Sequence, residues 1–409
     1  MPTMTTGVAL AHLLEAYGVR HIFGIPGVHN VEMYRGLWQT KIRHVSPRHE
    51  QGAGFMADGY ARVSGEPGVA FAITGPGLTN AATALGQAYG DSIPLLLISS
   101  VNRRHELGLG KGYLHEMPSQ ANLSAGLTAF SHTLLRPNEL PDLFAAAFAV
   151  FRSARPRPVH IEIPIDVGEE KFEWTDDRFV PFTSLPPAPA PAALDEAARL
   201  IAAAKRLLII AGGGAAGAAA EVAGLAELTG APVMMTTNGR GIVPAGHRLD
   251  SDFGIAYRDR EDLSREADLI LAIGTEMGET DYDFWSPLPF APAAPLIRID
   301  LDPRQIGIGP RPRLALVGDS AFAARGLSER LAGKQLAGDP KWAATCIDKS
   351  RKLMQRTREP EDPFFDLMFT RIRDELVDPI IIGDSTKPVY RAMLNYHAPG
   401  PRAFVSAAT

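Results

Sequence analysis

One short stretch of the chain gathers residue types that can do acid–base chemistry next to a closely approaching ligand. It runs from Arg48 to Arg62 and reads RHEQGAGFMADGYAR. Its carboxylate, Glu50, falls where a helix is expected to begin, and the small residues after it allow another backbone or a ligand to come close. The pattern leaves two interpretations open. Glu50 either satisfies the amides of the first helical turn, or it holds and transfers a proton in a site.

Two glycine-containing turns and two histidines are the other candidates for chemistry. Gly24-Ile25-Pro26-Gly27 and Gly75-Pro76-Gly77 each follow a short apolar run, and Asn80 lies just after the second turn. His29 follows the first turn, and His115 lies in a polar, glycine-rich segment that reads GLGKGYLHEMP. An imidazole can take up or release a proton near neutral pH. A capping or surface role explains His29 as well, a surface loop explains His115 as well, and ordinary turn chemistry explains the glycines as well.

The elements that must position these residues alternate between helix and strand. Short apolar runs separated by helical patterns favour a parallel sheet that helices cover on both faces. In the first 165 residues the expected strands are 21–23, 69–73, 94–98 and 159–163, with helices at 52–63 and 79–89.

The rest of the chain predicts further α/β units. Residues 167–190 are rich in proline and charge and are expected to be a linker. Residues 191–335 form a second, central unit, and residues 345–409 begin a third one. The predicted fold class is therefore α/β, with doubly wound, mostly parallel sheets. The first domain is expected to span residues 1–166.

The glycine-rich segment 212–217 in the central unit follows an expected strand and fits the spacing G-x-G-x-x-G. A dinucleotide-binding fingerprint also needs an acidic residue at the end of the next strand. Met234-Met235-Thr236-Thr237 stands there instead. A structural role is therefore favoured over the binding of a nucleotide. The acidic and aromatic run 276–285 is expected to be a solvated loop, with a basic substrate as the alternative partner.

Composition excludes several classes of function. The 409 residues carry a formal net charge of −5, which provides no basic surface for nucleic acid or for an anionic membrane. Cys346 is the single cysteine, so no internal disulfide and no cysteine-cluster metal site can form. No apolar run approaches the roughly 20 residues that a membrane-spanning helix needs. The N-terminus lacks the features of a secretory signal, and we expect a cytoplasmic protein.

Five motifs, taken together and in this order, resemble the thiamine-diphosphate-dependent family that includes acetolactate synthase and benzoylformate decarboxylase. They are GIPG at 24–27, RHEQGAGFMADGYAR at 48–62, TGPGLTN at 74–80, DSIPLLLIS at 91–99 and RPRPVHIEIPIDV at 155–167. The resemblance implies that residues 1–166 bind the pyrimidine side of thiamine diphosphate, that the central domain is Rossmann-like, and that residues 345–409 begin the diphosphate-side domain.

The resemblance also assigns roles to single residues. Glu50 matches the family's catalytic glutamate, whose carboxyl group hydrogen-bonds the cofactor's pyrimidine ring and is expected to be buried. His29 and His115 are the further catalytic candidates, for proton transfer or for orienting a substrate carboxylate. The residues expected to line the cofactor are Gly24, Ile25, Pro26, Gly27, Glu50, Gly75, Pro76, Gly77 and Asn80.

The function that the resemblance implies is non-oxidative decarboxylation of a 2-oxo acid through a C2 ylide of thiamine diphosphate. The family holds Mg²⁺ on a Gly-Asp-Gly motif, which this sequence lacks. No metal ligand is therefore nominated, and we expect a chain that stops before the Mg²⁺ site. FAD in the central domain is not favoured. The substrate is a small 2-oxo acid, and a homodimer or homotetramer is implied.

Two other functions stay open. A carboligase of the acetolactate synthase type shares the same cofactor chemistry, but His115 stands where that enzyme's DAFQE-like stretch has a glutamine. A non-catalytic nucleotide-binding or regulatory protein would explain the missing Mg²⁺ motif, but it has no need of Glu50. Among decarboxylases, the group acting on 5-guanidino-2-oxopentanoate is the nearest resemblance, carried by the segments 108–118 and 383–390.

Overall fold

A computed structural model describes residues 3–254, 261–278, 290–356 and 358–406. The chain divides into two compact units, Met1–Leu185 and Pro186–Thr409. Each unit is built around its own six-stranded sheet.

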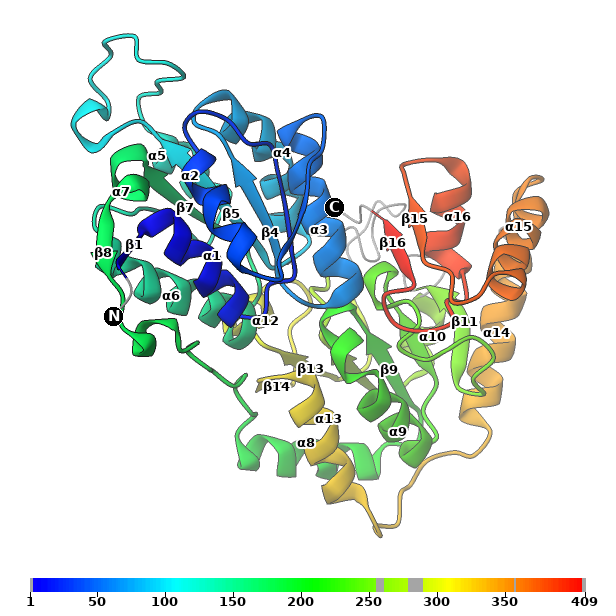
Figure 1. Cartoon of the computed structure of the whole chain (residues 1–409). Helices are drawn as coiled ribbons and strands as arrows, with labels where there is room; N and C mark the ends of the chain where they lie inside the picture. Colours follow the sequence, from blue (N-terminus) through cyan, green and yellow to red (C-terminus); the bar gives the residue numbers. More distant parts are fainter. Residues whose placement is uncertain (1–2, 255–260, 279–289, 357, 407–409) are drawn as a thin grey trace. The chain divides into compact units, whose positions relative to one another are not determined.

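In the first unit all six strands of the main sheet are parallel, in the order β3-β2-β4-β5-β7-β6 (Figure 1). Their carboxyl ends therefore meet at one edge, where open α/β sheets bind ligands. A separate antiparallel pair, β1 (Thr3–Thr5) with β8 (Lys171–Glu173), lies outside this sheet. The strands of the main sheet are β2 (His21–Gly24), β3 (Arg43–Val45), β4 (Gly68–Ala72), β5 (Leu95–Val101), β6 (Phe130–Thr133) and β7 (Val159–Pro164).

Helices cover both faces of this sheet, because alternate residues of its central strands enter two different cores. Val69 and Phe71 of β4 pack with the apolar sides of α1 and α6, whereas Ala70 and Ala72 pack with those of α3 and α4. Strands buried on both faces need continuous apolar runs, and this sequence provides them. The helices of the unit are α1 (Thr6–Ala16), α2 (Val31–Arg35), α3 (Glu50–Ser64), α4 (Pro76–Gly90), α5 (Gln120–Ala125), α6 (Leu140–Ser153) and α7 (Ile165–Glu169).

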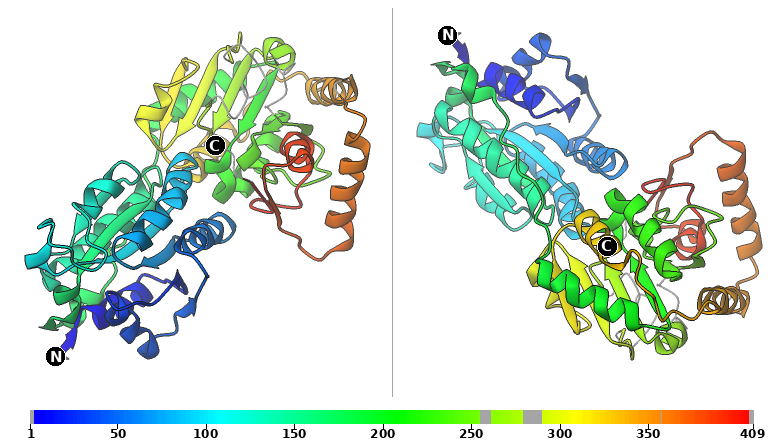
Figure 2. Two further views of the ribbon diagram at one scale, coloured as in Figure 1. Left: turned by 90° about the horizontal axis from the view of Figure 1, so that it is seen from above. Right: turned by 90° about the horizontal axis from the view of Figure 1, so that it is seen from below.

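The second unit has a parallel sheet in the order β11-β10-β9-β12-β13-β14. Its two faces also bury separate cores, one against α8, α9 and α13 and the other against α14. Two further views show the sheets with their helices (Figure 2). The elements are α8 (Pro191–Ala203), β9 (Leu207–Ala211), α9 (Ala219–Thr229), β10 (Val233–Met235), β11 (Asp250–Gly254), α10 (Glu261–Glu266), β12 (Leu269–Ile273), β13 (Leu296–Asp300), α12 (Pro303–Ile306), β14 (Leu314–Val317), α13 (Ser320–Leu331) and α14 (Trp342–Arg356).

The glycine-rich turn after β9 packs tightly against the end of β12. A Cβ on Gly212 would lie 2.5 Å from the carbonyl oxygen of Gly274, and a Cβ on Gly214 would lie 3.1 Å from the Gly274 Cα. Only glycine permits so close an approach. Packing within the protein therefore accounts for these glycines, in line with the structural role that we predicted for the turn.

The last part of the second unit has a small core of its own, formed by α15 (Asp362–Glu375), β15 (Ile381–Gly383), α16 (Lys387–Asn395) and β16 (Phe404–Ser406). β15 and β16 pair in parallel. The buried Arg240 ties this part to the rest of the unit, because its guanidinium donates to the carbonyl oxygens of Met393 and Leu394.

The predicted α/β class with parallel sheets is confirmed. Every strand expected from an apolar run is present. The sequence analysis did not predict the edge strands β3, β6 and β11 or the short strands β1, β8 and β16. β3 and β6 lack an apolar run because β3 is exposed and β6 is only partly buried. Residues 279–289, which include most of the acidic run, lie outside the described residues.

The division into domains stays a prediction. Within residues 167–190 the structure has the end of α7, the short strand β8 and a 3-10 turn at 176–179.

A titratable side chain is buried in the middle of the first sheet. His160 of β7 is fully buried, and its two ring nitrogens are hydrogen-bonded to the hydroxyls of Ser99 (2.8 Å) and Ser131 (2.7 Å). Burial lowers its pKa to about 3. The ring is therefore neutral in the fold, because protonation would bury a positive charge in the core.

This burial predicts a specific loss of stability in acid. Since the folded-state pKa lies below the ordinary value of about 6.5, the unfolded chain binds the proton first, and stability falls as pH drops from about 6.5 toward 3. Lowering the pH from 7.5 to 5 should reduce the unfolding free energy by about 2 kcal/mol through His160 alone. We expect His160→Gln to remove this part of the pH dependence, measured by hydrogen exchange of β5 and β7 peptides in increasing urea. Equal pH dependence in both proteins would contradict the expectation.

Candidate active site

The carboxyl ends of β2 and β4 bring the predicted residues of the first unit together. Glu50 is the first residue of α3, and its Oε2 accepts a hydrogen bond of 3.0 Å from the side-chain amide of Asn80 in α4. A Cβ on Gly77 would lie 3.6 Å from the Glu50 Cγ. Glu50 is only partly buried in this chain, whereas we expected it to be buried. Its carboxylate thus keeps an open side toward which a ligand can approach.

Ile73 joins the two glycine turns. It follows β4, and its side chain lies where a Cβ on Gly27 would be (2.4 Å from Cδ1) and where a Cβ on Gly77 would be (2.6 Å from Cγ2). Any larger residue at either glycine would push Ile73 away. The two turns are therefore held at a fixed separation by one apolar side chain.

Asn30 holds the backbone of the first turn, Gly24–Gly27, in place. The sequence analysis did not single out this residue. Asn30 is fully buried; its Oδ1 accepts from the Gly27 amide (2.7 Å), and its Nδ2 donates to the Ile25 carbonyl (3.2 Å). A buried polar side chain must find such partners. A lone Asn after a Gly-containing turn was the only signal in the sequence, and it is a weak one.

The second turn is fixed by a buried polar network. Gly75 has a φ of +66°, and its amide donates to Gln120 Oε1 at 2.5 Å. The Gln120 amide nitrogen donates in turn to the Ser100 carbonyl (2.9 Å) and to Glu162 (3.1 Å), and Glu162 also accepts from the Thr133 hydroxyl. Gln120 and Glu162 are buried. The network joins α5, β5, β6 and β7 to the turn, and no pattern in the sequence indicated it.

The two candidate histidines lie beside each other. Their ring centroids are 5.6 Å apart with an angle of 57° between the planes. His115 has a left-handed backbone (φ +58°), and a Cβ on Gly75 would lie 2.4 Å from its carbonyl oxygen. The pKa of His29 is lowered, first by burial and second by the charge of His115, while Glu106 acts in the opposite direction. Burial and the neighbouring ring therefore both favour the neutral form of His29.

Two buried polar atoms near the first turn have no hydrogen-bond partner among the described residues. They are His29 Nδ1 and Tyr34 Oη. A Cβ on Gly24 would lie 2.5 Å from Tyr34 Oη, and His44 Nε2 donates to the Gly24 carbonyl at 2.8 Å. Burial, and then the nearby Glu50 carboxylate, raise the pKa of Tyr34. Buried groups without partners call for an explanation, and a bound ligand or water at this edge provides one.

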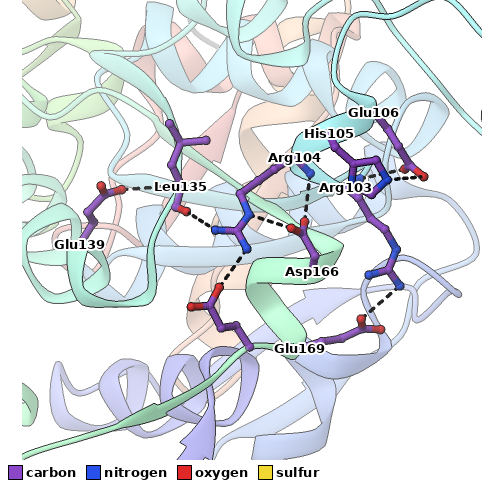
Figure 3. Close-up of polar contacts among 9 residues, drawn as sticks. Arg103, Arg104, His105, Glu106, Leu135, Glu139, Asp166 and Glu169 are labelled. Atoms are coloured by element: carbon purple, nitrogen blue, oxygen red, sulfur yellow. Dashed lines mark hydrogen bonds and ion pairs between the residues drawn. The ribbon is translucent and has the colours of Figure 1, made fainter.

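Other charged residues of the motifs serve the fold. Arg62 forms a buried ion pair with Asp58 on α3 (2.5 Å) and with Asp91 just after α4 (2.7 Å), which ties the two helices together. Arg104, which follows β5, bonds Asp166 of α7 and the Leu135 carbonyl (Figure 3). These contacts position the site without taking part in it.

Metal ligands do not gather in the described part of the chain. No group of three or more His, Cys, Asp or Glu side chains there could hold a metal ion. Among the same residues, no helix is long and apolar enough to cross a membrane.

The contact between Gly75 and His115 leads to a prediction. Gly75→Ala should lower the unfolding free energy by about 1–3 kcal/mol, because the residue would be strained at positive φ and its methyl group would meet the His115 carbonyl. Hydrogen exchange in urea would measure the loss, together with faster exchange around His115. Gly59→Ala is the matched control, since it lies in helix α3 and its Cβ would meet nothing within 4 Å. An equal effect of both substitutions would refute the argument.

Comparisons with known proteins identify the family of this chain. Residues 4–123 match the family model described as thiamine pyrophosphate enzyme, N-terminal TPP binding domain. Residues 194–327 match the model described as thiamine pyrophosphate enzyme, central domain. The first of these ranges contains Glu50, both glycine turns, both histidines and Gln120.

Relatives cover from about three quarters of the chain to almost all of it. A probable 2-ketoarginine decarboxylase of Pseudomonas aeruginosa is 44% identical over 98% of this chain and 71% of its own length. A probable acetolactate synthase large subunit of Methanocaldococcus jannaschii is 34% identical over 82% of this chain, and acetolactate synthase isozyme 1 of Escherichia coli is 35% identical over 76%. The chain spans only 57% and 55% of the length of these two synthases. With its motifs, its parallel sheets and these matches, the chain belongs to the thiamine-diphosphate-dependent enzyme family.

Proposed function

We propose that this chain is the pyrimidine-side and central part of an enzyme that decarboxylates a 2-oxo acid without oxidation. The observation that carries the proposal is the Glu50–Asn80 hydrogen bond at a glycine-lined sheet edge, beside the paired rings of His29 and His115. The similarity to a probable 2-ketoarginine decarboxylase supports decarboxylation.

The residues at this edge fit the aminopyrimidine of thiamine diphosphate. Glu50 offers a partly exposed carboxylate, and the unpartnered His29 Nδ1 and Tyr34 Oη offer further polar atoms. The cofactor, when bound, supplies a thiazolium ring that accepts the electrons released as carbon dioxide leaves. Gly24–Gly27 and Gly75–Gly77 would line its ring with backbone atoms.

Each side chain then has a defined task. Glu50 would share a proton with a pyrimidine ring nitrogen through a carboxylate oxygen that Asn80 keeps in place. His115 and His29 would stand on the substrate side, where an imidazole can orient a carboxylate and supply a proton. The lowered pKa of His29, caused first by burial, favours the neutral form of that ring.

For the substrate we propose a 2-oxo acid with a guanidinium tail. The name of the Pseudomonas aeruginosa relative supports it. The histidine at position 115, where a glutamine is typical of acetolactate synthase, argues only against that synthase. No residue of this chain is assigned to the tail. Mg²⁺ stays a prediction without a ligand here, and no nucleotide is proposed for the central domain.

A homodimer or homotetramer is part of the proposal. Phe55 and Met56 lie on α3, the helix that begins with Glu50, and both are exposed in the single chain. Exposed apolar side chains on one helix, close to a candidate site, are typical of a surface that another chain covers.

The task of Glu50 can be tested by proton exchange. Glu50→Gln keeps the size of the side chain but cannot share the proton, so exchange at C2 of bound thiamine diphosphate should slow by about 100-fold or more. Acid quenching and NMR of the cofactor in an active preparation with Mg²⁺ would measure the rate. Glu66→Gln, in the exposed turn after α3, is the control. Wild-type exchange in Glu50→Gln would rule out the role.

The reaction class can be tested by product analysis. With 5-guanidino-2-oxopentanoate we expect the corresponding aldehyde and carbon dioxide in equal amounts, and with pyruvate no acetolactate. The carboligase alternative draws on the matches to acetolactate synthases, and formation of acetolactate from pyruvate would favour it. No product from any 2-oxo acid, although thiamine diphosphate and Mg²⁺ are bound, would favour a non-catalytic protein.

A further inference from the structure

The loop that carries His115 is built from left-handed residues. Gly108 (φ +68°), Gly110 (+65°) and Gly112 (+79°) adopt this conformation at little cost because they have no Cβ. His115, at +58°, is not glycine. A non-glycine residue stays in this region only when its surroundings over-determine it. The loop must therefore contain interactions that hold His115 in place.

Glu116 provides such interactions from within the loop. Its Oε1 accepts from the Gly110 amide at 2.6 Å, and its Oε2 accepts from the amides of Gly112 (2.8 Å) and Tyr113 (3.1 Å). Successive amides that converge on one anion form a stable concave turn. The residue next to His115 thus closes the loop on itself through three charge-assisted hydrogen bonds.

The same carboxylate stays ionised in the working pH range. Partial desolvation works to raise the pKa of Glu116, but the hydrogen bonds from Gly110, Tyr113 and Gly112 outweigh it and hold the pKa below the ordinary value. Because both oxygens already accept amides, Glu116 is poorly suited to transfer a proton itself. Its contacts indicate that the Glu116 side chain holds the backbone of the loop in place.

The backbone beside His115 is fixed from the other side as well. The buried Asn102 donates to the Leu114 carbonyl at 3.1 Å, and the Gly75 turn abuts the His115 carbonyl. The backbone around His115 is therefore held on both sides. Glu116 holds one side, and Asn102 and Gly75 hold the other. The His115 ring projects from this fixed backbone to the side of His29.

We propose that Glu116 is a positioning residue, whose carboxylate folds the loop 108–116 and thereby sets the His115 ring against His29. It acts through His115 and does not touch the substrate. The proposal rests on the function proposed above in one respect, namely the use of His115 in the reaction.

The folding role is tested without cofactor or substrate. Hydrogen-exchange mass spectrometry should show exchange in peptides covering 108–117 faster by about tenfold or more in Glu116→Ala, and by less in Glu116→Gln, which keeps one acceptor oxygen. Peptides from β4 and β5 should be unchanged, since Glu116 is outside the core. Glu66→Gln is the matched exposed control. Unchanged exchange in this loop would overturn the proposal.

The positioning role is tested by kinetics in an active preparation. Glu116→Gln should lower kcat about tenfold with KM within twofold, because misplacing a reacting group weakens mainly the transition state. Glu116→Asp, which retains the charge, should recover part of the loss. In the His115→Ala background, Glu116→Gln should have no further effect on kcat.

The outcomes separate the two proposals. Full additivity of Glu116→Gln and His115→Ala would overturn positioning through His115, while leaving the function of His115 intact. Full activity of His115→Ala would overturn the use of His115 itself, and with it the need for positioning, even if the loop loosens as expected.

Discussion

The structure of the site depends on how closely the chain packs where β2 and β4 end. Ile73 separates the turns at Gly27 and Gly77, and Gly75 meets the His115 carbonyl, at distances where any Cβ would collide. This contact surface leaves no space for a side chain larger than hydrogen. Glu50, Asn80 and the two histidines are consequently placed by backbone geometry, with little freedom left to their own side chains.

Close packing alone would leave polar backbone groups without partners, and buried side chains satisfy them. Asn30 serves the first turn, and Gln120 serves the second through a network that reaches Glu162 and Thr133. A buried amide without a partner is costly, and a fully satisfied network is rigid. The site is thus set on three strands and a helix that share hydrogen bonds, so that a change at any member is felt at the Gly75 turn.

The site combines a framework set by the parallel sheet with a loop that folds by local hydrogen bonds. Glu50, both glycine turns and this loop all lie within residues 4–123, which match the N-terminal family model. The loop 108–116 folds around the Glu116 carboxylate and presents His115. A loop that folds by local hydrogen bonds can differ in sequence without disturbing the sheet. Such a loop is where a difference in substrate between relatives can arise.

The sequence by itself determined the strands, because continuous apolar runs bounded by glycine and proline have few other uses. It also determined that Glu50 begins a helix and that 24–27 and 75–77 are turns, since these are local properties of neighbouring residues. The edge strands β3 and β6 could not be predicted, because polar edge strands lack a continuous apolar run. The sequence could not predict the roles of four polar residues, because these roles depend on partners up to 45 residues away or on loop dihedral angles. They are Asn30, Tyr34, Gln120 and Glu116. Only the tertiary structure could decide which amides they bond, since the free energy of a buried or converging polar group depends on what surrounds it.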